Sequence, residues 1–415
     1  MTNPPVNHAP TLSVLLGAEP LLGPQSGIGR YSWELYRRLR QDDSGVRVIP
    51  FANGRFVPTA QLDAESPDQS VAPTVAAGCN TGAARRPGRE ALRRWVHAVP
   101  GYVAFRGWTL RWHPDYPYRD FRRYCKNPPP AAVYHEPNYV LRPFAGPAVV
   151  TIHDLGWLHF PHTLKPATRR IMERGMPQTL RRAAHFITVS RFVAEELTRH
   201  CGIPPDRISV TPLGVDSRFR PFDAVESRVL MDRLDLVHGR YLLAVGTREP
   251  RKNLSALVHA YAGLPMPLQE RYPLVLAGGQ GWGDALGARA ARLQRAGRIR
   301  LMGYVSEPDL ALLYAGAACF IMPSLYEGFG IPILEAMASG VPVVTSNRSA
   351  MPEVAGEAAL LVDPDDVTST SDALRLLLED SSLGQRLVRA GLARASKFSW
   401  QHTVDATLAV YRQIS

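Results

Sequence analysis

The stretch Pro323-Ser-Leu-Tyr-Glu-Gly-Phe-Gly-Ile-Pro-Ile-Leu-Glu-Ala-Met-Ala-Ser-Gly340 places two carboxylates, Glu327 and Glu335, around a Gly-Phe-Gly turn. The apolar run 318–322 before it predicts a buried parallel strand, and residues 331–339 predict a helix. Backbone N–H groups and the positive end of the helix dipole would then face one point, which suits a phosphate group. The residues expected at that point are Gly328, Phe329, Gly330 and Ile331.

The two glutamates have different expected partners. Glu335 lies about one turn into the helix, where a carboxylate can accept hydrogen bonds from a ribose diol, as the acidic residue of dinucleotide-binding folds does. Glu327 precedes the turn and would face the group attached to the phosphate.

The whole pattern resembles the signature of a known enzyme family. Glu-x7-Glu around Gly-Phe-Gly, with Pro-Ser before it and Ala-Ser-Gly-Val-Pro-Val-Val after it, is similar to family 4 (group 1) of the retaining, nucleotide-sugar-dependent glycosyltransferases. The resemblance implies the GT-B fold: two Rossmann-like domains facing across a cleft, with a C-terminal helix that crosses back to the first domain. It extends from about residue 12 to residue 411, except for 58–130.

The rest of the chain has the alternation expected of such α/β domains. Short apolar runs alternate with segments of helical periodicity, and the pattern breaks between 212 and 221. We expect strands at 12–17, 46–51, 131–134, 148–152, 186–189, 241–245, 274–277, 299–302, 318–322, 341–345 and 359–362. The predicted units are 1–220, the first domain, which would hold the acceptor; 221–398, which would bind the nucleotide sugar; and 399–415, the returning helix.

Length and composition agree with this organisation. At 415 residues the chain exceeds one ordinary core. It has no run of 18 apolar residues and no signal-type N-terminus, which predicts a cytoplasmic protein. The four cysteines, at 79, 125, 201 and 319, form no CxxC pair. They indicate reduced thiols, with neither a disulfide framework nor a zinc site.

The formal charge of +11 is concentrated in one segment. Between residues 81 and 126, eleven basic residues face three acidic ones, a local net charge of +8, among nine Trp, Tyr and Phe residues. This mixture suits an anionic membrane surface, here the inner face of the cytoplasmic membrane. A solvated, partly packed insertion is the alternative. RNA would also suit it, but no RNA-binding signature accompanies the charge, so nucleic acid is not an expected partner.

A second motif, Val245-Gly-Thr-Arg-Glu-Pro-Arg-Lys-Asn253, follows the first strand of the second domain. Cationic side chains at a strand-to-helix turn can clamp a diphosphate and neutralise its charge as it leaves. The segment resembles one in which the family's Lys holds the donor phosphates, which implies that role for Lys252. Relatives often have an Arg where this chain has Thr247, so either Arg248 or Arg251 would substitute.

The first domain supplies further candidates after its strands. Gly27 and Gly29, followed by Arg30, match the family's glycine loop beneath the donor. His153 matches a His that contacts the sugar near the reaction centre, with Asp154 orienting it. The remaining candidates are His135, Glu136, Asn138, Ser190 and Arg191, which would line the cleft or be buried, and Val305, which would meet the base through its backbone.

These residues imply transfer of a sugar with retention at the anomeric carbon. No D-x-D pair ends a strand, so neither a metal nor a cofactor is expected, and cations would stabilise the leaving diphosphate. Glu327 would hold sugar hydroxyls and would not act as a nucleophile. The motif wording is most similar to bacterial surface-polysaccharide mannosyltransferases, which implies GDP-mannose as donor and a lipid-linked saccharide as acceptor. Rhamnosyl, glucosyl or galactosyl transfer, or a non-catalytic nucleotide-sugar-binding scaffold, are the alternatives.

Overall fold

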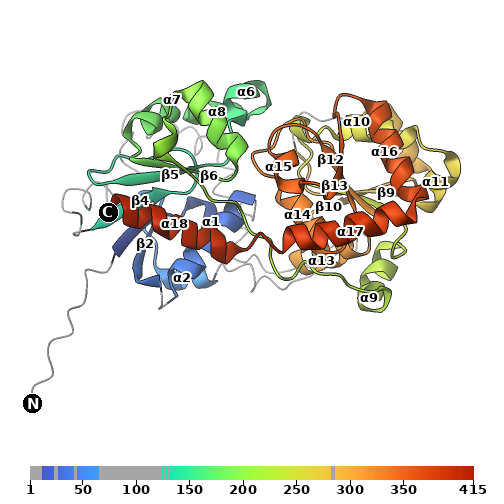
Figure 1. Ribbon diagram of the computed structural model, residues 1–415, viewed down its shortest axis with the longest axis horizontal. Coiled ribbons are helices and arrows are strands. Elements are labelled where there is room, and N and C mark those ends of the chain that lie inside the picture. Colours follow the sequence, from blue (N-terminus) through green and yellow to red (C-terminus); the bar gives the residue numbers. More distant parts are fainter. Residues whose placement is uncertain are drawn as a thin grey trace, which may run out of the picture.

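The protein consists of two α/β domains side by side (Figure 1). The computed structural model describes residues 12–22, 27–41, 44–64, 131–281 and 286–415, with the isolated Tyr124 and Pro128. Apart from Tyr124, the basic aromatic segment 81–126 lies outside these residues, and so does most of the insertion at 58–130. Its membrane role therefore stays a prediction.

Within the described ranges, the first domain has a seven-stranded sheet of order β3-β2-β1-β4-β5-β6-β7. All neighbouring strands pair in parallel except β3, which runs antiparallel to β2. The strands are β1 (Leu12–Gly17), β2 (Val46–Ala52), β3 (Arg55–Phe56), β4 (Ala132–Glu136), β5 (Ala148–Ile152), β6 (His185–Thr188) and β7 (Ile208–Val210). The helices are η1 (Glu19–Leu22), α1 (Gly27–Leu39), α2 (Thr59–Ala64), α6 (Gly156–His159), η5 (Pro161–Thr163), α7 (Pro166–Arg182), α8 (Arg191–Cys201) and η6 (Pro205–Arg207).

The described part of the second domain has a six-stranded, wholly parallel sheet of order β10-β9-β8-β11-β12-β13. Its strands are β8 (Leu242–Val245), β9 (Leu274–Ala277), β10 (Ile299–Gly303), β11 (Cys319–Met322), β12 (Val343–Ser346) and β13 (Ala359–Val362). Its helices are α9 (Ala224–Leu234), η7 (Pro250–Lys252), α10 (Leu254–Ala262), α11 (Met266–Arg271), α12 (Gly287–Arg295), α13 (Glu307–Ala315), α14 (Ile331–Ala338), α15 (Met351–Ala355), α16 (Val367–Glu379) and α17 (Ser381–Ala395).

Most strands lie where apolar residues follow one another. A parallel sheet covered by helices on both faces buries both sides of each strand, so the strand needs no polar alternation. All residues of β5, β9 and β11 are buried. The predicted strands are present with small shifts at their ends. The largest extension is at β4, which continues two residues beyond the predicted end, through Glu136.

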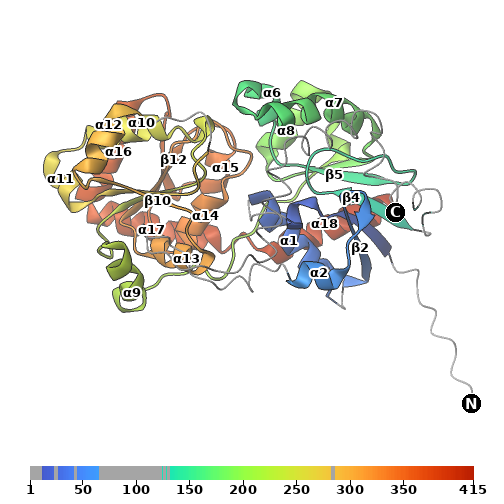
Figure 2. The same cartoon turned by 180° about the vertical axis from the view of Figure 1, so that it is seen from behind.

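The last helix, α18 (Trp400–Ile414), crosses back to the first domain, as the resemblance implied. Figures 1 and 2 show it lying along α1, on the opposite domain from α17. Its buried face includes Trp400, Val404, Leu408 and Tyr411. Full burial of a large apolar side chain contributes roughly 1.5–3 kcal/mol, so this face anchors the helix firmly on the first domain.

None of the helices described by the structure has both the length and the apolarity needed to span a membrane.

Candidate functional site

A cavity of about 520 Å³ lies between the two domains, beyond the carboxyl ends of their strands. Ligands of open α/β sheets bind at this edge, because helix N-termini and loops converge there. Thirteen of the predicted site residues line the cavity: Gly27, Arg30, His153, Asp154, Arg251, Lys252, Val305, Glu327, Gly328, Phe329, Gly330, Ile331 and Glu335.

The Gly-Phe-Gly turn needs glycine at both ends, for different reasons. A Cβ atom on Gly328 would lie 1.7 Å from the carbonyl oxygen of His153, in the opposite domain. Gly330 has φ 107° at the N-cap of α14, a conformation that side chains rarely adopt. The turn can therefore bring backbone N–H groups and the N-terminus of α14 up to the first domain, where an anion would be held.

Lys252 and Glu327 form an ion pair across this turn. Lys252 ends the short η7 that follows β8, and its Nζ lies 2.6 Å from Glu327 Oε1. Both side chains are largely buried, with 18% and 13% of their surface exposed. The pair places a positive and a negative group beside the Gly-Phe-Gly turn. The positive group suits a leaving diphosphate, and the negative group can accept hydrogen bonds from sugar hydroxyls.

Glu335 is buried on α14 and faces the first domain through Arg30. The Arg30 guanidinium lies 3.2 Å from Glu335 Oε1 and also pairs with Glu307, at the start of α13. Burial raises the pKa of Glu335, and the charge of Arg30 acts in the opposite direction. The carboxylate predicted to hold a ribose thus already has a cationic partner from the other domain.

His153 is buried at the cavity wall, directly after β5. Its Nε2 lies 2.8 Å from the Pro137 carbonyl oxygen, which can only accept, so Nε2 carries the proton. Burial lowers the pKa of His153, while the hydrogen bond to Pro137 raises it in part. The neutral ring therefore keeps Nδ1 as a hydrogen-bond acceptor.

Of the two arginines left open by the sequence, Arg251 lines the cavity and Arg248 does not. Arg251 Nη1 lies 3.2 Å from Asp154 Oδ2, across the domain boundary, and its Nη2 lies 3.0 Å from Glu249 Oε1. Burial disfavours the charged guanidinium, but Asp154, Glu327 and Glu249 raise its pKa above the ordinary value. Asp154 therefore binds Arg251 and the Gly156 N–H, and no hydrogen bond joins it to His153 among the described contacts.

His135 and Glu136 are buried inside β4, so of the two alternatives that the sequence leaves open, cleft lining is wrong and burial holds, in the strand and not in a loop. His135 bonds through Nδ1 to the Tyr411 hydroxyl of α18 (2.5 Å) and through Nε2 to the Thr151 hydroxyl (2.8 Å). Burial lowers its pKa to about 3. Glu136 accepts a hydrogen bond from the Tyr134 hydroxyl, and burial, with the nearby Glu19 carboxylate, raises its pKa to about 8.

Four other expected residues also lie off the cavity wall. Gly29 is buried inside α1, and Asn138 is exposed. The Ser190 hydroxyl caps α8 and donates to the Gly328 carbonyl oxygen (2.7 Å), so it supports the turn without lining the cavity. The Arg191 side chain is 76% exposed and lies 3.5 Å from Glu353.

The sequence reasoning missed several residues of the cavity wall. Tyr139, Glu249, Tyr304 and Glu307 all line it. Glu249 lies within the motif 245–253, Tyr139 follows Asn138, and Tyr304 and Glu307 lie within two residues of Val305, so proximity to predicted site residues is the signal that the sequence offers. The sequence predicts a ligand contact for Arg30 and gives no sign of its intramolecular partner Glu307.

Comparison with known proteins agrees with this geometry. The family model described as "Glycosyl transferases group 1" matches residues 235–394, and that described as "Glycosyltransferase Family 4" matches 25–219. The O-antigen chain mannosyltransferase B of Escherichia coli is 35% identical over 408 residues, covering 97% of this chain and all of the relative. The chain belongs to the family 4 glycosyltransferases. This glycosyltransferase is thus similar to that relative over nearly its whole length.

Solved structures confirm the GT-B fold of the enzyme. Sucrose-phosphate synthase from Thermosynechococcus elongatus superposes with a TM-score of 0.64, at 21% identity, covering 97% of this chain and 98% of the other. The Anabaena protein HepE, solved with UDP and glucose, also has a TM-score of 0.64, at 15% identity, covering 97% and 100%. At these identities the likeness shows the fold alone.

Proposed function

We propose that the enzyme transfers mannose from GDP-mannose, with retention, to a lipid-linked saccharide during surface-polysaccharide assembly. The observation that carries the proposal is the cavity in which Lys252, Glu327 and Glu335 meet His153 of the opposite domain. Support for mannose comes from the full-length similarity to an O-antigen chain mannosyltransferase. The nucleotide sugar would lie against the second domain, and the acceptor would approach from the first.

The leaving diphosphate would be stabilised by fixed positive groups. Lys252, Arg251 and the N-terminus of α14 converge on the cavity, and each favours negative charge. Because Lys252 is already ion-paired with Glu327 at 2.6 Å, it is held in place before charge develops. This arrangement supports metal-independent transfer, since cationic side chains supply the charge that a divalent ion would otherwise supply.

Sugar hydroxyls would be held by Glu327 and His153. Glu327 can accept hydrogen bonds from two hydroxyls of the donor sugar while its Oε1 keeps Lys252. The neutral His153 ring can accept from a third hydroxyl at Nδ1, because its Nε2 proton is donated to Pro137. Arg30 lies 3.2 Å from the Glu335 carboxylate. A ribose that binds Glu335 must therefore either share this carboxylate with Arg30 or displace Arg30 from it.

Peripheral attachment to the inner face of the cytoplasmic membrane is part of the proposal. The charge and aromatic content of 81–126 motivate it. Helix α7 adds exposed basic residues, Arg169, Arg170, Arg174, Arg181 and Arg182, of which Arg169 pairs with Glu173, and its Ile171 is 57% exposed. Basic residues near an anionic bilayer each contribute about 1 kcal/mol.

Thermal stability against a panel of nucleotide sugars, without metal, tests the donor. A ligand at about 100 times its Kd stabilises the folded state by about 2.7 kcal/mol. We expect GDP-mannose to raise Tm, and Glu335→Ala to weaken that response while the exposed Glu379→Ala control keeps it. Transfer of radiolabelled mannose to a lipid-linked saccharide extract then tests the acceptor.

Other outcomes would separate the parts of the proposal. A Tm response to a UDP or TDP sugar alone would reject GDP-mannose and keep the site. No response to any nucleotide sugar would reject the cavity as a donor-binding site. A vesicle flotation assay with anionic lipids tests attachment independently, and its failure would leave the donor assignment intact.

A further inference from the structure

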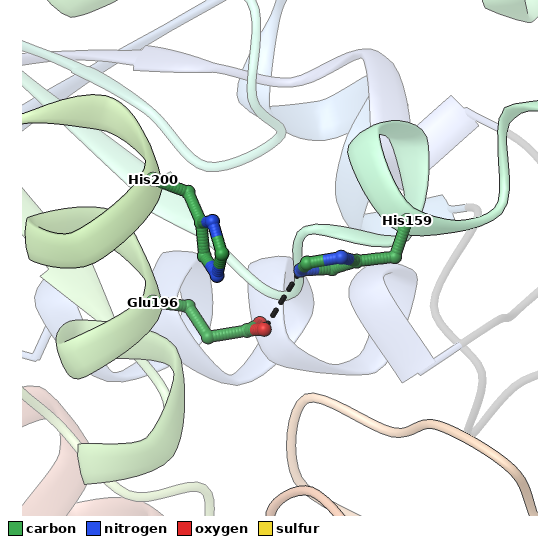
Figure 3. A group of neighbouring side chains, drawn as sticks. All are labelled: His159, Glu196 and His200. Atoms are coloured by element: carbon green, nitrogen blue, oxygen red, sulfur yellow. Dashed lines mark ion pairs between the residues drawn. The ribbon is translucent and has the colours of Figure 1, made fainter.

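Two histidines and a glutamate cluster on the first domain, away from the donor cavity. His159 ends α6, and Glu196 and His200 stand one turn apart on α8. Their potential ligand atoms all lie within 4.8 Å of one another. Figure 3 shows the two imidazole rings and the carboxylate converging between the two helices. None of the three lines the donor cavity.

The hydrogen bonding of the cluster is incomplete. His159 Nε2 lies 2.7 Å from Glu196 Oε1, but among the described contacts this buried nitrogen has no hydrogen bond of acceptable geometry. A buried polar atom without a hydrogen bond is costly. His159 Nε2 and Glu196 Oε1 therefore face the same point, and their mutual contact leaves the nitrogen without a satisfactory hydrogen bond.

The other oxygen of Glu196 is fixed from the second domain. Glu196 Oε2 accepts a hydrogen bond from the Tyr326 hydroxyl, which itself accepts one from the Leu155 N–H at 2.8 Å. A carboxylate held through one oxygen presents the other in a fixed direction, as the outer-shell partners of metal ligands do. Tyr326 immediately precedes Glu327, so the cluster is connected to the donor-binding turn.

We propose that His159, Glu196 and His200 bind a divalent transition-metal ion, with zinc the best match. Two imidazoles and one carboxylate suit Zn²⁺, whereas Mg²⁺ and Ca²⁺ prefer oxygen alone. Ligand atoms about 2 Å from a tetrahedral zinc lie about 3.3 Å apart. The present ligand atoms lie within 4.8 Å of one another, and His200, whose ring packs edge-on against that of His159 at 5.1 Å, is exposed to solvent. Solvent would occupy the fourth position.

The ion would stabilise the contact between the domains and would not contact the diphosphate. By holding Glu196, it would hold Tyr326 and the loop that leads into Glu327. Loss of Tyr326 should therefore weaken metal binding, although Tyr326 is not a ligand. The metal-independent transfer proposed above is unaffected, because its cations come from Lys252 and Arg251.

Isothermal titration of chelator-treated, full-length enzyme with zinc chloride tests the site. We expect saturable binding of one ion per chain, reduced to adventitious binding in His200→Ala. The matched control, His402→Ala, replaces an exposed histidine on α18 and should bind as wild type does. Since His200 is exposed, its replacement should leave the fold intact, which circular dichroism would check. No saturable binding, or unchanged binding in His200→Ala, would overturn the proposal.

Cobalt substitution and Tyr326→Phe sharpen the test. Co²⁺ at a nitrogen-containing tetrahedral site should give visible absorption that His200→Ala abolishes. Tyr326→Phe should weaken zinc binding about tenfold, the lower end of the effect of losing an outer-shell partner. Wild-type affinity in Tyr326→Phe would overturn the link between this ion and the donor-binding turn.

Discussion

The segment Glu327–Glu335 of the second domain and the segment His135–Asn138 of the first both bring acidic groups to the end of a parallel strand, with opposite results. In the second domain, β11 ends at Met322, and Glu327 lies in the loop beyond it, on the cavity wall. In the first, β4 continues through Glu136, and its polar side chains are enclosed in the core. A polar group beyond a strand end can meet a ligand, and one inside the strand must find its partners in the protein.

Lys252→Ala, which removes a cation from the cavity of the second domain, is the substitution with the largest expected effect. Removing a group aimed at developing charge costs about 10²–10³ in turnover, and we expect a fall in kcat of that size, measured by donor-dependent transfer. Lys397→Ala, at an exposed lysine, is the control and should be unchanged. Full turnover in Lys252→Ala would mean that the cavity does not hold the diphosphate as described.

Gly328→Ala tests whether the turn must approach the first domain. A Cβ atom there would lie 1.7 Å from the His153 carbonyl oxygen, so the domains could not reach the present contact. Misplacement by about 1 Å can cost about 10² in rate, and we expect kcat to fall by that factor with the secondary structure retained. Gly384→Ala, where a Cβ meets no atom within 4 Å, serves as control. Unimpaired kcat would show that catalysis does not need this contact.

Glu136→Gln tests the buried carboxyl group of β4 through the pH dependence of stability. The pKa of Glu136 is raised to about 8 in the folded state, against about 4.3 in the unfolded chain. The protonated side chain therefore contributes fully to the free energy of unfolding below pH 4.3, and this contribution is lost as the pH rises through 8. The isosteric amide removes that loss. Linkage between these two pKa values gives a gain of about 4–5 kcal/mol in the free energy of unfolding at pH 8 and less than about 1 kcal/mol at pH 4.5, measured by urea denaturation.

Transfer activity separates a structural role of Glu136 from a role in binding. Glu136→Gln should keep kcat/KM at pH 7, since the side chain lies off the cavity. A tenfold loss of kcat/KM without loss of stability would restore Glu136 to the site.

Arg191→Ala should have the smallest effect. Its side chain is 76% exposed, and Glu353 is held mainly by the backbone N–H groups of Arg191 and Phe192, at 3.0 and 3.1 Å. Exposed ion pairs contribute at most about 1 kcal/mol, so stability and kcat/KM should change little in thermal melts and transfer assays. A large loss of activity would indicate an acceptor contact at this position.

The sequence predicted the strands well because most buried parallel strands consist mainly of apolar residues. It missed β7, whose Ile-Ser-Val is short, lies at the sheet edge and contains Ser209, and it missed the two-residue β3. The candidate site was predicted best in the second domain, where glycines and charges mark the loops. In the first domain, the sequence predicts that β4 ends at residue 134, two residues too early. That prediction places His135 and Glu136 in the following loop, whereas they lie in the strand.

What no motif could reveal was how residues from the two domains pair. Arg30 and Glu335 are 305 positions apart and form an ion pair only in the folded chain. The same holds for Arg251 and Asp154. Charge at a strand end indicates a site, but whether a ligand or another side chain neutralises it depends on how the domains meet.

The returning helix has a consequence for the order of folding during synthesis. Arg38 of α1 donates a hydrogen bond to Gln401, 363 positions later. The hydrogen bond of His135 likewise needs the Tyr411 hydroxyl, near the end of the given sequence. A ribosome adding about 5–20 residues per second would leave the α1 surface without its cover for tens of seconds. Through that interval the amino-terminal half would present an apolar surface that chaperones can recognise, and it would complete its core only after the carboxyl-terminal half had emerged.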